Sequence, residues 1–213
     1  MTELQVAIDL LTTEAALELA GKVAPYVDII ELGTPLIKAE GLKVVTAMKA
    51  AFPDKLVFAD MKTADTGALE AEIAFKAGAD LVTVMGTVDD ATIKGAVEAA
   101  KKYGKQVVVD TIGVKNRVQR AKEVTEFGVA FVELHAGLDE QALPGYSVQT
   151  LIAEGREAKV PFSVAGGVNI DTIKDVVAAG ADVAVAGGAI YGAEDPAAAA
   201  KALKEAISSV TVQ

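Results

Sequence analysis

The sequence predicts a TIM (β/α)8 barrel, and three observations lead to this fold class. Short runs rich in valine and isoleucine alternate eight times with alanine-, glutamate- and lysine-rich segments of helical periodicity. The strand-like runs are almost continuously apolar, as expected for parallel strands whose two faces are both covered. No proline- or serine-rich linker interrupts the chain, so we expect residues 1–213 to form one α/β domain.

The strands and helices follow in strict alternation along the chain. The expected strands are Leu4–Leu10, Val27–Gly33, Lys55–Lys62, Leu81–Gly86, Gln106–Thr111, Phe131–Ala136, Pro161–Gly166 and Val183–Gly187. The expected helices are Thr13–Val23, Pro35–Ala51, Thr66–Ala77, Asp89–Tyr103, Arg117–Phe127, Val148–Ala158, Ile170–Ala179 and Pro196–Val210. Eight strand–helix units match the count of a TIM barrel, at the short end of its length range.

Local signals support these boundaries. Asp195 is a typical helix N-cap, and Pro196 after it stands at the first helical position, where proline is favoured. The sequence Ala77–Asp80 recurs as Ala179–Asp182, a sign of repeated strand–helix units. An open doubly wound sheet is the alternative, but it usually has fewer strands and a glycine-rich first turn, whereas Asp9–Thr13 contains no glycine. Four helices are followed by a glycine that ends them: Gly78, Gly104, Gly128 and Gly180.

Composition excludes several classes of function. The chain has 213 residues, 52% of them apolar, and no cysteine, which rules out disulfides, thiolate metal sites and cysteine nucleophiles. The net charge of −10 disfavours nucleic acid and anionic membranes as partners. No apolar run approaches the roughly 20 residues of a membrane span, and the N-terminus lacks the basic start of a signal peptide. We therefore expect a soluble cytoplasmic protein.

Ionisable residues gather at the carboxyl ends of the predicted strands, where active sites of this fold lie. Strand alternation places Phe58, Asp60 and Lys62 on one face, and it likewise pairs Glu133 with His135. Singly, such residues are often helix caps, structural ion pairs or satisfied histidines. Together they predict a catalytic mouth, because their mutual repulsion requires a metal or substrate. The residues are Asp9, Glu31, Asp60, Lys62, Asp110, Glu133 and His135.

Two glycine pairs predict an anion site. Gly166 and Gly167 follow the seventh strand, and Gly187 and Gly188 follow the eighth. Glycines at these two places let backbone N–H groups approach a phosphate, and a helix N-terminus adds its dipole. Tight turns between strand and helix also use glycine, so either pair alone is a weak signal.

The residue types at the mouth also indicate a metal and a proton carrier. Glu31 and Asp60 lie on adjacent predicted strands without cysteine or histidine beside them, which suits a magnesium ion that keeps waters and takes substrate oxygens. Such an ion stabilises a developing enediolate. His135 is the single histidine of the chain and the natural proton carrier near neutral pH.

Motifs spread over almost the whole chain resemble a known superfamily. Asp60–Asp65 reads Asp-Met-Lys-Thr-Ala-Asp, which is similar to the Asp-x-Lys-x-x-Asp signature of the orotidine monophosphate decarboxylase superfamily. Leu4–Asp9 and Val27–Thr34 resemble the branch that holds 3-hexulose-6-phosphate synthases and 3-keto-L-gulonate-6-phosphate decarboxylases. Phe131–Gln141 looks like the synthases. The resemblance implies a magnesium-dependent homodimeric barrel that condenses formaldehyde with D-ribulose 5-phosphate in the ribulose monophosphate pathway.

The resemblance also implies roles for individual residues. Glu31 and Asp60 would hold the metal. Lys62 would support an enediolate, with Asp9 placing it, and His135 would transfer the proton. Asp65 would reach into the active site of the neighbouring subunit. Asp110, which we count among the catalytic residues, stands where the gulonate decarboxylases carry glutamate.

Further departures from the decarboxylases lie at three positions. Those enzymes carry arginine where Leu138 stands, threonine where Ala165 stands, and a phosphate-binding arginine at the position of Gly188. All of these differences favour an aldehyde-lyase of the synthase type, which would form D-arabino-hex-3-ulose 6-phosphate. The decarboxylase is the alternative function, and a non-catalytic barrel that binds a phosphosugar is the second alternative. The crowded acidic residues around Lys62 argue against the non-catalytic barrel, since a protein that only binds a phosphosugar has no need to place like charges so close together.

Overall fold

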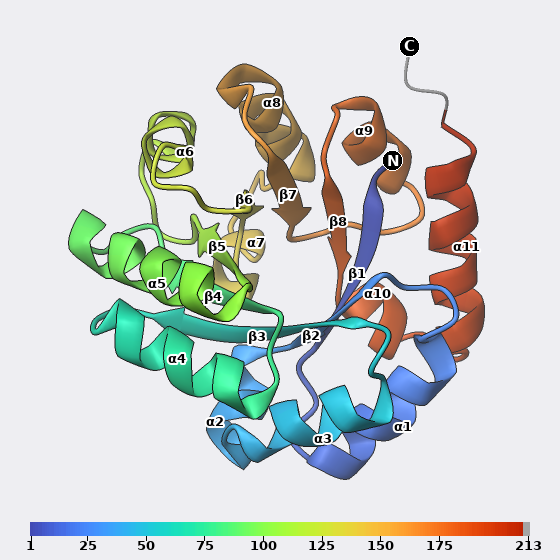
Figure 1. Ribbon diagram of the computed structural model, residues 1–213. Helices are drawn as coiled ribbons and strands as arrows, with labels where there is room; N and C mark the ends of the chain where they lie inside the picture. The colour runs from blue at the N-terminus through green and yellow to red at the C-terminus, as the bar shows by residue number, and fades with distance from the viewer. Residues whose placement is uncertain (211–213) are drawn as a thin grey trace.

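The computed structural model describes residues 1–210 and shows a closed barrel of eight parallel strands surrounded by helices (Figure 1). The strands follow one another around the barrel in sequence order, and β8 (Val183–Ala186) pairs with β1 (Glu3–Ile8) to close it. Each helix returns the chain over the outside of the barrel to the next parallel strand. The predicted fold class, a TIM barrel, is confirmed.

The elements that make up this barrel alternate along the chain. The remaining strands are β2 (Ile29–Leu32), β3 (Leu56–Thr63), β4 (Leu81–Met85), β5 (Gln106–Asp110), β6 (Phe131–His135) and β7 (Phe162–Ala165). The helices are α1 (Thr13–Val23), α2 (Thr34–Glu40), α3 (Lys43–Ala51), α4 (Gly67–Ala77), α5 (Asp90–Tyr103), α6 (Arg117–Thr125), α7 (Leu138–Gln141), α8 (Val148–Ala158), α9 (Ile173–Ala178), α10 (Gly188–Tyr191) and α11 (Pro196–Ser208).

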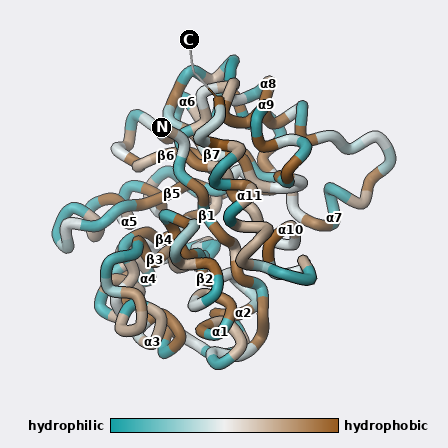
Figure 2. The backbone as a smooth tube through the Cα atoms, turned by 90° about the vertical axis from the view of Figure 1, so that its right-hand side faces the viewer, coloured by the Kyte–Doolittle hydropathy of each residue, from teal (hydrophilic) through white to brown (hydrophobic). Residues whose placement is uncertain are grey.

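Two apolar cores hold the barrel together. The larger core lies between the strands and the surrounding helices and includes residues such as Ile30, Leu36 and Ile93. Along the helices, apolar and polar residues alternate, which is visible as brown and teal bands in Figure 2. The smaller core fills the barrel interior with side chains from alternate strand positions: Ile29, Phe58, Leu81, Val108, Phe131, Ala165, Val183 and Val185. Because side chains alternate between the two faces of a strand, the inward-facing positions nearer the carboxyl ends line the polar mouth of the barrel.

The repeated Ala-Gly-Ala-Asp sequence has a structural explanation. Asp80 precedes β4 and accepts a hydrogen bond from the backbone N–H of Val57 at the start of the neighbouring β3, with a distance of 2.9 Å. Asp182 precedes β8 and accepts the N–H of Phe162 in β7 at 3.0 Å. In each case the aspartate satisfies an N–H at the beginning of the adjacent strand. The repeat therefore fixes strand register at the end of the barrel opposite the mouth.

The expectation of one helix over Pro35–Ala51 is wrong. The structure has two helices, because Gly41 adopts φ 68° and its N–H donates to the carbonyl of Ile37, which ends α2. A residue with positive φ cannot continue a right-handed helix, and glycine adopts this conformation without steric cost. α3 then begins at Lys43 in a new direction.

Other helix boundaries are shifted as well. The helix expected from Ile170 begins at Ile173, since the side chain of Asn169 accepts the N–H groups of Asp171 and Thr172 and forms a turn there. The last helix ends at Ser208. Remaining boundaries move by one or two residues, as is usual at element ends. α7 and α10 were not expected, because four residues are too few to show helical periodicity.

Figure 2 shows the segment around α7 projecting from the body of the barrel beside the strand ends. Within residues 1–210, no helix is both long enough and apolar enough to cross a membrane.

Candidate active site

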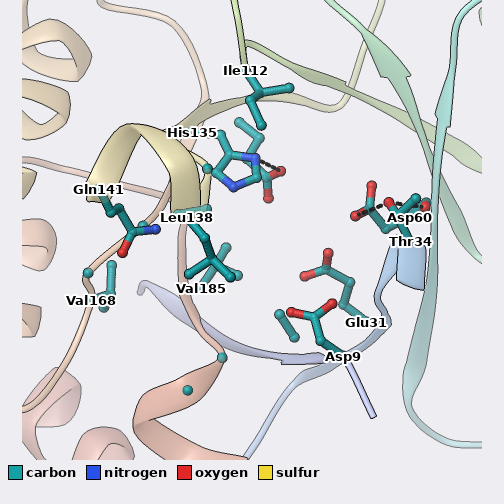
Figure 3. A pocket seen from close by; sticks show the side chains of 18 of the residues that line it. Asp9, Glu31, Thr34, Asp60, Ile112, His135, Leu138, Gln141, Val168 and Val185 are labelled. Atoms are coloured by element: carbon teal, nitrogen blue, oxygen red, sulfur yellow. Dashed lines mark hydrogen bonds and ion pairs between the residues drawn. The ribbon is translucent and has the colours of Figure 1, made fainter. Parts of the chain in front are cut away.

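A pocket of about 900 Å³ opens at the carboxyl ends of the barrel strands, which is the end where TIM-barrel active sites lie. Figure 3 shows the carboxylates of Asp9, Glu31 and Asp60 on one side of this pocket and the imidazole of His135 on the other. The fully buried Asp110 lies beneath them. The structure thus brings together all the ionisable residues of the predicted strand ends: Asp9, Glu31, Asp60, Lys62, Asp110, Glu133 and His135.

A bulge in β3 delivers Lys62 to this mouth. Ala59 pairs with Val82 of β4 and Thr63 pairs with Val84, so three residues of β3 stand opposite the single Thr83. Lys62 has φ 43°, a left-handed conformation that is uncommon outside glycine. Alternation places Lys62 on the face of Asp60, and its side chain does reach Asp60, but through the bulge and not through a regular pleat. Bulges commonly re-aim side chains next to active sites.

The ammonium group of Lys62 is held between two carboxylates. Its Nζ donates to Asp60 Oδ2 at 2.9 Å and to Asp110 Oδ2 at 2.7 Å. Burial works against the charged form, but the negative charges of Asp60, Asp110 and Glu133 outweigh it and hold the pKa of Lys62 well above its usual value. The side chain therefore stays protonated, which makes it a hydrogen-bond donor and a positive charge instead of a nucleophile.

Asp110 also orients the imidazole of His135. The Nδ1 atom of His135 lies 2.9 Å from Asp110 Oδ2, and the backbone N–H of Ile112 donates to Asp110 Oδ1 at 2.8 Å. Burial opposes the charge of Asp110, but the hydrogen bond and charge of His135, followed by those of Lys62, outweigh it and hold the pKa of Asp110 well below its usual range. With Nδ1 bound to a carboxylate, His135 presents Nε2 to the pocket.

Three carboxylates crowd the opposite side of the pocket. Burial is the main cause that raises the pKa of Glu31 well above its usual value, and the nearby charge of Asp60 adds to it. Gln5 Nε2 donates to Glu31 Oε2 at 2.7 Å and partly opposes this shift. Burial and then Asp60 raise the pKa of Asp9 in the same way. The hydroxyl of Thr34 donates to Asp60 Oδ2 at 2.8 Å.

This excess of negative charge fits a hard divalent cation. Carboxylate oxygens are the ligands that Mg²⁺ prefers, and one or two of them suffice when substrate and water complete the octahedron. Glu31 and Asp60 come from adjacent strands and line the pocket together. A cation between them would offset the burial and the repulsion from Asp60 that raise the pKa of Glu31. The donor set therefore fits the magnesium ion expected from the sequence.

A second group of acids has ligand atoms close enough to hold a cation. One ligand atom each of Asp110, Glu133 and His135 lies within 4.8 Å of the others. Here, however, Asp110 already accepts hydrogen bonds from Lys62 and His135. Burial, followed by the charge of Asp110, raises the pKa of Glu133 well above its usual value. Asp110 is thus engaged by two ionisable side chains, whereas within residues 1–210 Asp60 forms an ion pair with Lys62 alone and Glu31 accepts only the neutral amide of Gln5. Glu31 and Asp60 are therefore the better candidates for the metal.

The glycine pairs line the same pocket between β7, β8 and β1. Gly166 has φ 117°, and a Cβ atom there would lie 2.5 Å from the carbonyl oxygen of Ala136. Gly167 has φ 82°. These positions require glycine, so the loop keeps its backbone at the pocket surface. Gly188 does not require glycine for steric reasons, since a Cβ atom there would meet only the hydroxyl of Tyr191, at an ordinary contact distance of 3.9 Å.

Asp65 is the one predicted catalytic residue that neither lines the pocket nor forms a hydrogen bond or ion pair with a residue that does. It is exposed just before α4, and its Oδ1 accepts the N–H of Thr66 at 2.7 Å. Two large apolar side chains of α4 are exposed nearby along the chain, Leu69 at 61% and Ile73 at 42%. Asp65 therefore adds nothing to the pocket of its own chain.

Comparisons with known proteins identify the family. Residues 2–203 match the orotidine 5'-phosphate decarboxylase / HUMPS family. The chain belongs to this family. The 3-hexulose-6-phosphate synthase of Mycobacterium gastri is 69% identical over 206 residues, which cover 97% of this chain and 100% of that protein.

Solved structures agree with this assignment. A crystal structure of a 3-hexulose-6-phosphate synthase superposes with a TM-score of 0.95 at 70% identity, covering 96% of this chain and 99% of the other. The 3-keto-L-gulonate-6-phosphate decarboxylase of Vibrio cholerae superposes with a TM-score of 0.86 at 31% identity, covering 97% of both chains. The chain is thus similar to members of both branches that its motifs resemble, and more similar to the synthase.

The sequence interpretation missed three polar residues that hold the site in place. Gln5, Thr34 and Thr83 donate hydrogen bonds to Glu31 or Asp60. Gln5 and Thr83 are fully buried on the inner face of β1 and β4. An amide or hydroxyl within an otherwise apolar strand was the available signal, since buried polar groups need partners.

Proposed function

We propose that this chain is an aldehyde-lyase with 3-hexulose-6-phosphate synthase activity. It condenses formaldehyde with D-ribulose 5-phosphate to give D-arabino-hex-3-ulose 6-phosphate in the ribulose monophosphate pathway. The observation that carries the proposal is the 69% identity, over 97% of the chain, to a relative of that name. The polar array at the barrel mouth supports it, because the proton carrier, the ammonium group and the candidate metal ligands lie in or beneath one pocket.

The proton transfer belongs to His135. Nε2 of its imidazole takes a proton from C1 of ribulose 5-phosphate, and the electron pair of that C–H bond moves toward the C2 carbonyl to give an enediolate. The C2 carbonyl then re-forms while the electron pair of the C1–C2 double bond makes the new bond to the formaldehyde carbon, and the π electrons of formaldehyde move onto its oxygen. The formaldehyde oxygen takes the proton back from the imidazolium and becomes a hydroxyl group. Asp110 holds the imidazole in position through its contact with Nδ1.

Charge on the substrate oxygens is balanced from the opposite side of the pocket. Lys62 remains protonated and donates a hydrogen bond to the developing oxyanion, which is stabilised most in a preorganised site that excludes water. Glu31 and Asp60 would hold Mg²⁺, which supplies Lewis-acid polarisation of substrate oxygens when bound. Asp9 lies beside them and positions the substrate hydroxyl groups.

The phosphate group binds at the glycine loops. Gly166 and Gly167 follow β7, and Gly187 and Gly188 follow β8, and all four line the pocket. The first pair adopts positive φ values that favour glycine, and without side chains at these positions backbone N–H groups can approach an anion. The pocket offers no arginine among its lining residues within 1–210, so neutral donors carry most of this contact.

Two copies of the chain form the active enzyme in this proposal. Asp65 is exposed and outside its own pocket, and it precedes a helix that exposes Leu69 and Ile73. A second copy that covers α4 would bury these apolar side chains and bring Asp65 to the rim of the partner's pocket. Burial of exposed apolar surface is the usual driving force for such association.

The decarboxylase is the second candidate, and three residues that line the pocket bear on the choice between the two functions. Leu138, Ala165 and Gly188 replace an arginine, a threonine and another arginine of the decarboxylases, and all three line the pocket. An apolar side chain at Leu138 offers no positive charge for a substrate carboxylate. This difference favours the synthase, whose second substrate, formaldehyde, is uncharged.

The test offers purified protein both substrates in the presence of Mg²⁺. We expect formaldehyde to be consumed only when ribulose 5-phosphate is present, and the His135→Asn variant serves as a control against contaminating activity. Release of carbon dioxide from 3-keto-L-gulonate 6-phosphate without formaldehyde consumption would identify the decarboxylase instead. Thermal stabilisation by ribulose 5-phosphate without turnover of either substrate would identify a non-catalytic binding protein.

A further inference from the structure

The hydroxyl group of Thr83 lies between the two site residues that β3 supplies. Its Oγ1 accepts a hydrogen bond from the backbone N–H of Lys62 at 2.9 Å and donates to Asp60 Oδ1 at 2.7 Å. An N–H group can only donate, so the single hydroxyl proton is used toward the carboxylate. Thr83 has no exposed surface and does not line the pocket. It therefore contacts the site residues without contacting substrate.

The bulge in β3 creates the need for this hydroxyl. Thr83 is the single residue of β4 opposite residues 60–62 of β3, so the N–H of Lys62 cannot pair with a β4 carbonyl in the regular ladder. A buried N–H without a partner is costly, as is a lysine at φ 43°. The Thr83 hydroxyl supplies the missing acceptor, and the bond stabilises the conformation that turns Lys62 toward Asp110.

The same hydroxyl fixes the orientation of the Asp60 carboxylate. Asp60 Oδ1 accepts from Thr83, while Oδ2 accepts from Thr34 at 2.8 Å and from Lys62 at 2.9 Å. Donors on both oxygens leave the carboxylate little freedom to rotate. Partners of metal ligands are known to act in this way, since they orient the ligand before the metal arrives.

We propose that Thr83 is a positioning residue for the reaction, and that its hydroxyl sets both the left-handed backbone of Lys62 and the carboxylate plane of Asp60. This inference rests on the proposed function. Because Thr83 acts through two other residues, its loss should lower kcat and Mg²⁺ affinity, while the phosphate contacts at the distant β7 and β8 loops stay intact. The KM for ribulose 5-phosphate should therefore change little.

Three variants separate positioning from folding. Thr83→Val has nearly the same shape without the hydroxyl, and Thr83→Ser keeps the hydroxyl. Thr2→Val is the matched control, since Thr2 is also buried and its hydroxyl donates to the carbonyl of Ala181 at 2.7 Å, next to the start of β8 at the end of the barrel opposite the mouth. For each protein, kcat, KM, Mg²⁺-dependent thermal stabilisation and the hydrogen exchange of the Lys62 amide are measured.

The expected results differ clearly among the variants. In Thr83→Val, kcat should fall about 10- to 100-fold, the scale of a lost hydrogen bond to a charged group. The Mg²⁺ concentration at half-maximal stabilisation should rise roughly tenfold, as for loss of a partner of a metal ligand. The Lys62 amide, protected in the parent, should exchange faster. Thr83→Ser should recover most of kcat, and Thr2→Val should change only thermal stability.

Parental kcat and Mg²⁺ response in folded Thr83→Val would overturn the proposal. If that variant does not fold, the parent decides, because an unprotected Lys62 amide would show that the hydrogen bond is absent. Failure of the proposed function is recognised separately. In that case the parent shows no condensation of formaldehyde, while amide protection and Mg²⁺ stabilisation still report on Thr83.

Discussion

The substitution Asp110→Asn tests the electrostatic arrangement of the site most directly. Asparagine has the same shape as aspartate, but it replaces a buried carboxylate that accepts hydrogen bonds from Lys62 Nζ, His135 Nδ1 and the N–H of Ile112. The neutral amide offers a single oxygen for these three donors. Its NH2 group cannot accept from His135, so the imidazole loses either its orientation or its charge partner.

The contacts set the expected size of the effect. A hydrogen bond to a charged group contributes about 1.5–3 kcal/mol, and the removed desolvation cost of Asp110 offsets part of the loss. We therefore expect a net destabilisation of about 1–3 kcal/mol. Proton transfer should suffer more, because correct orientation of a general base is worth roughly 10²–10⁴-fold in rate. The rate of proton exchange at C1 should fall in this range.

The assay follows C1 of ribulose 5-phosphate by NMR in deuterated water with Mg²⁺ and without formaldehyde. This isolates proton abstraction from the formation of the carbon–carbon bond. His135→Asn should slow the same exchange to a comparable extent, because Asp110 acts through the imidazole. Thermal unfolding of each variant, measured in parallel, shows how much of the loss reflects destabilisation.

Asp182→Asn is the matched control. Asp182 is exposed at the far end of the barrel, where its Oδ2 accepts the N–H of Phe162 at 3.0 Å. It should change stability slightly and leave C1 exchange at the parental rate. Parental exchange in a folded Asp110→Asn protein would refute the reasoning, since it would show that orientation of His135 by this carboxylate does not limit proton transfer.

Three further predictions follow from the site. The raised pKa of Glu31 means that the folded protein keeps a proton that the unfolded chain releases near pH ~4.3, so without Mg²⁺ stability should fall as pH rises above that value. Glu31→Gln should lessen this fall and abolish stabilisation by Mg²⁺; an unchanged response to Mg²⁺ would place the metal elsewhere. Asp65→Asn and Lys62→Ala should each be nearly inactive, whereas mixed dimers of the two should regain part of the activity, and failure to do so would exclude shared sites. Gly166→Val should raise the KM for ribulose 5-phosphate by roughly 10- to 100-fold through strain at φ 117°, and an unchanged KM would remove this loop from phosphate binding.

Much of the fold could be predicted because the signals are local. Glycines such as Gly78 and Gly104 end helices with positive φ, and the Asp195 side chain caps α11 as its sequence indicates. The break at Gly41 was missed, because a glycine inside an amphipathic segment can continue or end a helix depending on what packs against it. Four-residue helices such as α7 carry no periodic signal at all.

The ionisable residues of the candidate site could also be identified from sequence. Parallel strands all end on the same side of a barrel, so a polar residue at the end of each strand must lie near the others once the fold is known. Asp9, Glu31 and His135 needed only this topological argument to be placed at one mouth. Their roles in catalysis stay predictions that the variants above would test.

The sequence by itself determined the barrel, the end at which its polar residues converge and the family to which it belongs, because these depend on periodicity and on local motifs. Only the tertiary structure decided how the charges are paired. Lys62 reaches Asp110, 48 positions away, through a bulge whose backbone depends on Thr83 of the next strand. Such contacts join residues distant in sequence, and their geometry is set by strand register and packing, which no local pattern encodes.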